Sequence, residues 1–254
     1  MPLPFFLAFF AGGLFVGSFL NVCIHRIPLR ESIAWPGSHC TTCNRQLSWY
    51  ENVPLASWVV LGGRCRTCGQ GISVRYPVVE LVTGLVFAGG VLVYGVTPLL
   101  AVRLAFACAL IVLFAIDLQH QILPNVITLP GIVAGFAASL FLPPGWLSSA
   151  IGIVAGGGSL LAIAESYRRI RGQDGLGMGD VKMLAMIGAF LGWPLMILTL
   201  ILASFAGSIV GVALIASKRG GLQAALPFGT FLALGALVSA VAGGPILSWY
   251  LSFY

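Results

Sequence analysis

Two acidic side chains, those of Asp117 and Asp180, lie at the ends of apolar runs in a chain that has only seven Asp and Glu residues. Two predicted membrane spans separate them, so both must lie on the same side of a membrane whatever the orientation of the chain. Ionisable groups at membrane depth are costly and are usually functional. Two carboxylates brought together can share one proton, so that one activates water as a base while the other protonates the carbonyl oxygen or the leaving amine. This is the chemistry of aspartic proteases.

The residues around Asp180 favour a peptide substrate but also allow a simpler role. Gly177 and Gly179 permit a peptide strand to approach the backbone closely. Taken alone, Asp180 could equally be a helix N-cap, because a carboxylate there accepts backbone N–H bonds and complements the helix dipole. Asp117 is harder to explain in that way, since it ends an apolar run, where an acid opposes the dipole. Lys182 is either an electrostatic partner of Asp180 or an interfacial side chain that extends to the membrane surface.

Four cysteines form two Cys-x-x-Cys motifs separated by residues 44–64, namely Cys40, Cys43, Cys65 and Cys68. This spacing brings four thiolates within tetrahedral reach of one Zn²⁺. A segment this short has little core of its own, so a metal would contribute much of its folding free energy. The alternatives are disulfides, which the reducing cytoplasmic side disfavours, or a redox pair, which accounts for only one motif. His39 is expected to be a bystander, and Cys23 and Cys108 are expected to be inert packing residues.

Composition places most of the chain in lipid. Hydrophobic residues make up 59% and charged residues 8% of the 254 positions, and the mean hydropathy is +1.01; soluble domains have about 25% charged residues. Apolar runs of roughly 17–25 residues mark membrane helices. Eight runs are predicted, near residues 4–24, 78–97, 99–116, 126–142, 148–165, 181–196, 197–216 and 226–250. The boundary between the sixth and seventh rests on a tight turn at Trp193 and Pro194.

The basic residues predict the orientation of these spans. Almost all of them lie between spans 1 and 2, 5 and 6, or 7 and 8: Arg26, Arg30, Arg45, Arg64, Arg66, Arg75, Arg168, Arg169, Arg171, Lys182, Lys218 and Arg219. Only Arg103 falls on the other side. The positive-inside rule then places residues 25–77, 117–125, 166–181 and 217–225 in the cytoplasm. The net charge of +6 is therefore an orientation signal, and no nucleic-acid partner is expected.

The predicted fold is an all-α polytopic membrane protein with about eight transmembrane helices and a small cytoplasmic zinc-binding segment between the first two. Residues 1–24 are expected to be a retained transmembrane helix, because the chain lacks the basic start of a signal peptide. Residues 25–77 are predicted to be a cytoplasmic tetracysteine domain, and residues 78–254 a seven-helix membrane peptidase domain.

Several motifs together resemble the type IV prepilin peptidases, bifunctional leader peptidases and N-methyltransferases of type IV pilus and type II secretion systems. The resemblance runs in order from about residue 13 to 230. The matching segments are residues 17–22 with His25 and Arg26, both cysteine motifs, residues 75–81, the segment from Asp117 to Asn125, and residues 177–182. The Gly-Met-Gly-Asp-Val-Lys block and the paired cysteine motifs are the most specific of these.

The resemblance implies that Asp117 and Asp180 are the catalytic pair, with Gly177, Gly179 and Lys182 in the supporting loop. It implies a multi-pass protein of the bacterial inner membrane that cuts prepilins and pseudopilins after a glycine at the cytoplasmic face. It further implies methylation of the new N-terminus from S-adenosylmethionine, with a structural zinc in the cysteine segment. Glu80, at the start of a span, would then hold a substrate ammonium or serve the methyltransferase site, or else complement a helix dipole.

Two other classes of protein share some of these features. A transporter also places aspartates at membrane depth, but near the midplane and on broken helices. A zinc-ribbon membrane scaffold would keep the cysteines and have no use for paired aspartates. The interfacial position of both Asp117 and Asp180 favours the peptidase.

Overall fold

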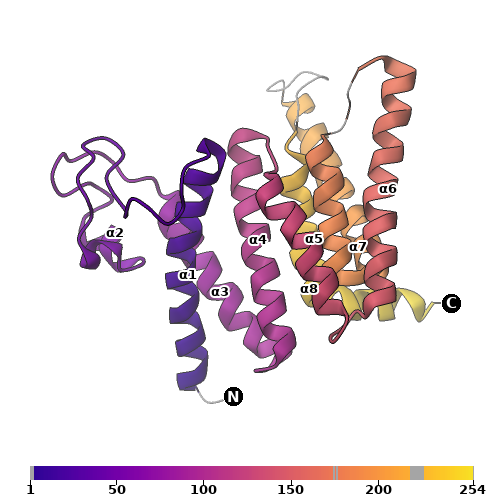
Figure 1. Ribbon diagram of the computed structural model, residues 1–254, viewed down its shortest axis with the longest axis horizontal. Helices are drawn as coiled ribbons and strands as arrows, with labels where there is room; N and C mark the ends of the chain where they lie inside the picture. Colours follow the sequence, from indigo (N-terminus) through magenta and orange to yellow (C-terminus); the bar gives the residue numbers. More distant parts are fainter. Residues whose placement is uncertain (1–2, 174, 176, 218–225, 254) are drawn as a thin grey trace. The chain divides into compact units, whose positions relative to one another are not determined.

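The computed structural model describes residues 3–173, 175, 177–217 and 226–253 (Figure 1). Lys218 and Arg219, used above, and Asp174 lie outside this part. The described residues form helices and two isolated β-bridges, which confirms the all-helical class. The elements are α1 (Leu3–Leu29), η1 (Trp49–Asn52), α2 (Ala56–Val60), α3 (Arg75–Tyr94), α4 (Pro98–His120), α5 (Asn125–Ser139), α6 (Trp146–Arg171), α7 (Met178–Ala216) and α8 (Phe228–Leu251).

The chain divides into two compact units, Met1–Leu100 and Ala101–Tyr254. In the first unit α1 packs along α3, and glycines allow the two backbones to approach closely. A Cβ placed on Gly13 would lie 2.8 Å from the Gly84 Cα, and one on Gly17 would lie 2.7 Å from the Glu80 Cα. Small residues at such contacts are typical of helices that associate in lipid, where close van der Waals packing replaces the hydrophobic effect.

In the second unit α7 is the central helix, and α5, α6 and α8 all pack against it. Gly152 of α6 lies directly on Gly188 of α7, where an added Cβ on Gly152 would stand 2.6 Å from the Gly188 carbonyl oxygen. Further along, Gly235 and Gly243 of α8 lie against the second half of α7. The end of α4 and the beginnings of α5, α7 and α8 lie at one end of this unit (Figure 1).

The helix α7 is broken at Gly192, which has φ 78° and ψ 170°. An unbroken helix of 39 residues would be about 58 Å long, nearly twice the roughly 30 Å hydrocarbon core of a bilayer. The predicted turn at Trp193 and Pro194 therefore begins one residue earlier, at a glycine that can adopt positive φ. Pro144 and the Ser148 hydroxyl fill the space where a Gly192 side chain would stand.

The break leaves carbonyl groups that other helices must satisfy. The usual donor to the Phe190 carbonyl would be the N–H of residue 194, but Pro194 has none. Arg103 of α4 donates to this carbonyl instead, at 2.9 Å, and the Ser149 hydroxyl donates to the Ala189 carbonyl at 2.8 Å. Arg103, the one basic residue predicted on the far side of the membrane, thus stabilises the end of a broken helix.

Six helices in the described part are long and apolar enough to cross a membrane: α1, α3, α4, α6, α7 and α8. The apolar helix α5 is shorter, and α7 covers the sixth and seventh predicted spans. The prediction of about eight spans is therefore approximate in its count, although each predicted run falls on a helix.

Candidate active site and metal site

Asp117 lies in the last turn of α4, and its side chain is turned into the second unit. The residue is 4% exposed. Its Oδ2 accepts two hydrogen bonds from Thr230, one from the backbone N–H at 2.7 Å and one from the hydroxyl at 3.1 Å. Thr230 is in the first turn of α8, where helix N–H groups lack partners within the helix. The Asp117 carboxylate therefore binds the N-terminus of a different helix, which offsets the unfavourable dipole of its own helix end.

Asp180 is the third residue of α7 and half-buried. The N-cap residue is Gly177, so Asp180 is in the first turn and is not the cap itself. Its backbone N–H donates to the Gly177 carbonyl at 3.1 Å. Leu123 packs against Gly179, the neighbour of Asp180, and also against Gly229, where an added Cβ would lie 3.0 Å from Asp117 Oδ2. The structure thus brings the two predicted carboxylates together at one end of the second unit.

The segment between α4 and α5 packs into this site. Leu123 lies against both Gly179 and Gly229, because a Cβ on either glycine would come within 2.8 Å of Leu123 carbon atoms. Two residues later, Asn125 accepts a hydrogen bond from the Lys182 ammonium at 2.9 Å. Lys182 therefore ties the start of α7 to the start of α5. Leu123 closes the space between the first turns of α7 and α8.

Sequence reasoning missed Thr230, Gly229 and Leu123. Thr230 is separated from Asp117 by 113 positions, and no spacing rule connects residues so far apart. The one local signal was the proline and glycine at the start of the last apolar run, which mark a helix N-terminus with free N–H groups. That signal predicts where the helix begins, but it does not predict which side chain accepts hydrogen bonds from the free N–H groups.

The four cysteines form a second site in the first unit. Each Cys-x-x-Cys motif makes the same tight turn, closed by backbone hydrogen bonds to the first cysteine. In the first turn the Asn44 N–H donates to the Cys40 carbonyl at 2.9 Å, and in the second the Gly69 N–H donates to the Cys65 carbonyl at 2.9 Å. Asn44 and Gly69 both have positive φ, as this turn requires. The repeated geometry points the cysteines of both motifs toward one point.

The sulfur positions fit a tetrahedral metal site. The four Sγ atoms all lie within 4.8 Å of one another, and the Cys40 and Cys68 sulfurs are 3.8 Å apart. A tetrahedral zinc with bonds of about 2.3 Å separates its sulfur ligands by about 3.8 Å. A disulfide would need about 2.05 Å, and all six cysteines are free.

Backbone N–H groups also favour thiolates at the first cysteine of each motif. The N–H groups of Cys68 and Thr67 lower the pKa of the Cys65 thiol to about 6. Those of Cys43 and Thr42 likewise lower the pKa of Cys40. Thiolates are the form that binds metal. The donor set and its surroundings therefore suit a divalent metal ion with a preference for sulfur.

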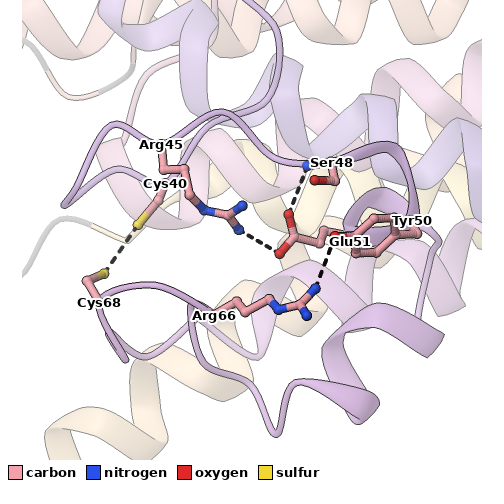
Figure 2. Close-up of polar contacts among 7 residues, drawn as sticks. All are labelled: Cys40, Arg45, Ser48, Tyr50, Glu51, Arg66 and Cys68. Atoms are coloured by element: carbon pink, nitrogen blue, oxygen red, sulfur yellow. Dashed lines mark hydrogen bonds and ion pairs between the residues drawn. The ribbon is translucent and has the colours of Figure 1, made fainter.

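The short helix η1 contacts both cysteine turns, through Glu51 and Tyr50 (Figure 2). The Glu51 carboxylate accepts the Ser48 N–H at 2.8 Å and the Arg45 guanidinium at 2.6 Å. These two donors lower the pKa of Glu51. The neighbouring Tyr50 hydroxyl accepts a hydrogen bond from Arg66, which lies inside the second motif. η1 thus contacts arginines from both turns, and these contacts need no metal.

Glu80, the remaining predicted site residue of this unit, has its side chain buried within the unit. It lies in the second turn of α3, is 7% exposed, and accepts the Leu55 N–H at 2.8 Å. Leu55 has φ 59°, unusual for a leucine. Glu80 therefore ties the cysteine segment to the α1 and α3 pair. Of the residues expected to play no chemical role, His39 contacts the Gly37 carbonyl and Cys23 is buried in α1.

Comparison with known proteins divides the chain in a similar way. Residues 12–94 match the model of the Bacterial Peptidase A24 N-terminal domain, and residues 104–212 match that of the Type IV leader peptidase family. A prepilin leader peptidase/N-methyltransferase of Myxococcus xanthus is 43% identical over 221 residues, which cover 86% of this chain and 66% of that protein. Proteins of the same name from Pseudomonas aeruginosa and Stutzerimonas stutzeri are 34% and 33% identical over 276 residues, 99% of this chain and 95% and 96% of theirs. No solved structure matches the chain.

Proposed function

Because the chain belongs to the type IV leader peptidase family, we propose that it is an aspartic endopeptidase that removes the leader of prepilins and pseudopilins and then methylates the new N-terminus. The observation that carries the peptidase assignment is that Asp117, bound to the start of α8, and Asp180, at the start of α7, lie on the two sides of Leu123 at one end of the second unit. The curated relatives are named for both activities, and their names support the methyl transfer.

The chemistry requires one proton to be shared by the two carboxylates. The ionised carboxylate takes a proton from water as that water attacks the scissile carbonyl carbon, and the protonated one donates to the carbonyl oxygen. Collapse of the tetrahedral intermediate breaks the C–N bond, and the amine leaves with a proton from the pair. The products are the leader carboxylate and a free pilin N-terminus. Asp117 and Asp180 account for every proton in this cycle without a metal.

The position of the pair suits a substrate whose cleavage site borders an apolar helix. Asp117 is in the last turn of α4 and Asp180 in the first turn of α7, so both lie where apolar helices end. Gly177, just outside α7, is exposed and has no side chain to block an extended peptide. A prepilin, with a short polar leader followed by an apolar helix, would present its scissile bond at this depth.

The basic residues favour a cytoplasmic location for the pair, in a multi-pass protein of the bacterial inner membrane. Arg168, Arg169 and Arg171 end α6 on the segment that leads to Asp180. Basic residues next to membrane helices are retained in the cytoplasm. The leader would then be cut on the cytoplasmic side of the membrane.

We assign a structural Zn²⁺ to the four cysteines and the methyl-transfer function to the first unit. S-adenosylmethionine would supply the methyl group, and the new pilin amine would accept it. Zinc would fix the geometry of residues 40–68, which have few buried apolar side chains of their own. Glu80 of α3 accepts the N–H of Leu55 in this segment, and we propose that its carboxylate serves the methyltransferase site, either by binding the pilin ammonium or by holding Leu55 in place.

One experiment tests both activities. Purified protein in detergent is mixed with a prepilin and S-adenosylmethionine, and the product is measured by mass spectrometry. Loss of the leader mass demonstrates the peptidase, and gain of one methyl group on the shortened pilin demonstrates the transferase. An intact prepilin, with the protein folded and metal-loaded, would refute the peptidase assignment.

A further inference from the structure

One residue, Thr230, supplies both hydrogen bonds that the Asp117 carboxylate receives in the described part of the chain, and both reach the same oxygen, Oδ2. We infer that Thr230 positions Asp117 for hydrolysis: it holds Oδ2 and leaves Oδ1 for the catalytic water and for Asp180. This inference rests on the proposed catalytic pair. It adds a positioning residue from a helix outside the residues matched by the family model, which end at 212.

The backbone contact is the stronger of the two. The Thr230 N–H lies 2.7 Å from Oδ2 and 3.2 Å from the Pro227 carbonyl, so the carboxylate is its nearer acceptor. The N–H belongs to the first turn of α8, at the positive end of the helix dipole. A carboxylate bound there keeps a fixed position and its negative charge is stabilised. This contact survives any side-chain substitution at position 230 that leaves the N–H in place.

The hydroxyl contact fixes the rotation of the carboxylate. A single N–H would allow the group to pivot about the Oδ2 contact, whereas a second donor 3.1 Å away restricts that rotation. Thr230 is 6% exposed, so its hydroxyl has little access to competing solvent. The β-branched side chain restricts χ1 and keeps the hydroxyl in place. The hydroxyl is therefore the part of the contact that a substitution can test.

Gly229, next to Thr230, also contributes to the position of the Asp117 carboxylate. A Cβ on Gly229 would lie 3.0 Å from Asp117 Oδ2 and 2.8 Å from the Leu123 side chain. The missing side chain is what lets the carboxylate reach the N-terminus of α8. Any larger residue there would push Oδ2 away from both Thr230 donors.

The test compares Thr230→Val with Thr230→Ser in the full-length protein. Valine has nearly the shape of threonine but no hydroxyl, and the backbone N–H is kept. We expect kcat for prepilin cleavage to fall about tenfold to hundredfold, as for loss of a hydrogen bond to a charged group, with KM changed less than about twofold. Serine restores the hydroxyl and should recover kcat to within about threefold. Methylation of a pilin that has already been cleaved should be unchanged in both variants.

A second variant guards against a folding defect at position 230. Gly229→Ala should lower kcat while keeping the Thr230 hydroxyl, and Gly244→Ala, which has open space around it in the same helix, should not. Native kcat in both Thr230→Val and Gly229→Ala would overturn the positioning role. Equal losses in Thr230→Val and Thr230→Ser would assign the effect to packing and would also overturn it. Normal cleavage by Asp117→Asn would instead refute the proposed catalytic pair.

Discussion

Replacing Asp117 by asparagine is the sharpest test of the proposed pair, because the structure shows how little else the change disturbs. Oδ2 accepts the Thr230 N–H and hydroxyl at 2.7 and 3.1 Å. The asparagine carbonyl oxygen can accept the same two bonds, and its amide group then stands in place of Oδ1. The shape and the contact with α8 are kept, whereas the group can no longer exchange a proton with Asp180.

The expected loss follows from the role that is removed. Positioned acid–base groups contribute about 10²- to 10⁴-fold to a rate, which corresponds to about 3–5 kcal/mol in activation free energy. Cleavage of a purified prepilin should therefore slow by at least two orders of magnitude, measured by mass spectrometry of leader release under single-turnover conditions. Methylation of a pre-cleaved pilin should continue, since the first unit is unchanged.

A matched carboxylate-to-amide change provides the control. Glu165, on α6, pairs with Arg168 and Arg169 in exposed contacts, which contribute little to stability. Glu165→Gln and Asp174→Asn should cleave within about twofold of the native rate. If Asp117→Asn cleaves at more than a tenth of the native rate while its thermal unfolding is unchanged, Asp117 has no part in proton transfer. Equal losses in the control would show that the assay reports membrane insertion and not catalysis.

Three further outcomes follow from the two sites and from the packing of α7. Cleavage should show a bell-shaped dependence on pH from the coupled pair, and immediate, reversible inhibition by a chelator, with residues 25–77 still folded, would contradict a metal-free mechanism. Elemental analysis should find about one zinc per chain. The variant Cys65→Ser should contain less zinc, and its residues 25–77 should become sensitive to limited proteolysis. Methyl transfer by this variant should fall more than cleavage. Gly188→Ala places a Cβ against the Gly152 carbonyl and should destabilise the protein by about 1–3 kcal/mol, measured as a lower Tm in detergent. The control is Gly158→Ala, because Gly158 has open space around it. An equal Tm for both variants would contradict the close contact between α6 and α7.

The sequence predicted those parts of the molecule that follow from local residue patterns and from the number of membrane spans between two residues. Apolar runs indicate membrane helices because unsatisfied backbone groups are too costly in lipid. An even number of spans between Asp117 and Asp180 requires a common side before any coordinate is known. The cysteine spacing predicts one cluster, since two tight turns can bring four sulfurs together with little help from the rest of the chain.

The parts that the sequence did not predict depend on contacts between distant helices. Thr230 meets Asp117 only because α8 begins beside the end of α4. Arg103 appeared as an exception to the charge rule, and its role became clear only from the Phe190 carbonyl, which Pro194 leaves without a donor. Which residue supplies the hydrogen bond depends on how the helices pack. The local sequence can therefore show that a donor is needed, but it does not show which residue is the donor.

If Asp117 and Asp180 are the catalytic pair, as proposed, their placement in a last and in a first helical turn also determines how hydration and bilayer thickness enter the reaction. A hydrolase with carboxylates at the bilayer centre must conduct water through lipid, whereas a pair at helix ends can take its water from the headgroup layer. The pilin helix can then stay in the hydrocarbon core while only its polar end unwinds. A change of bilayer thickness shifts the depth at which the apolar helix rests. For the proposed pair, membrane thickness would thus set the depth of the scissile bond relative to the two carboxylates.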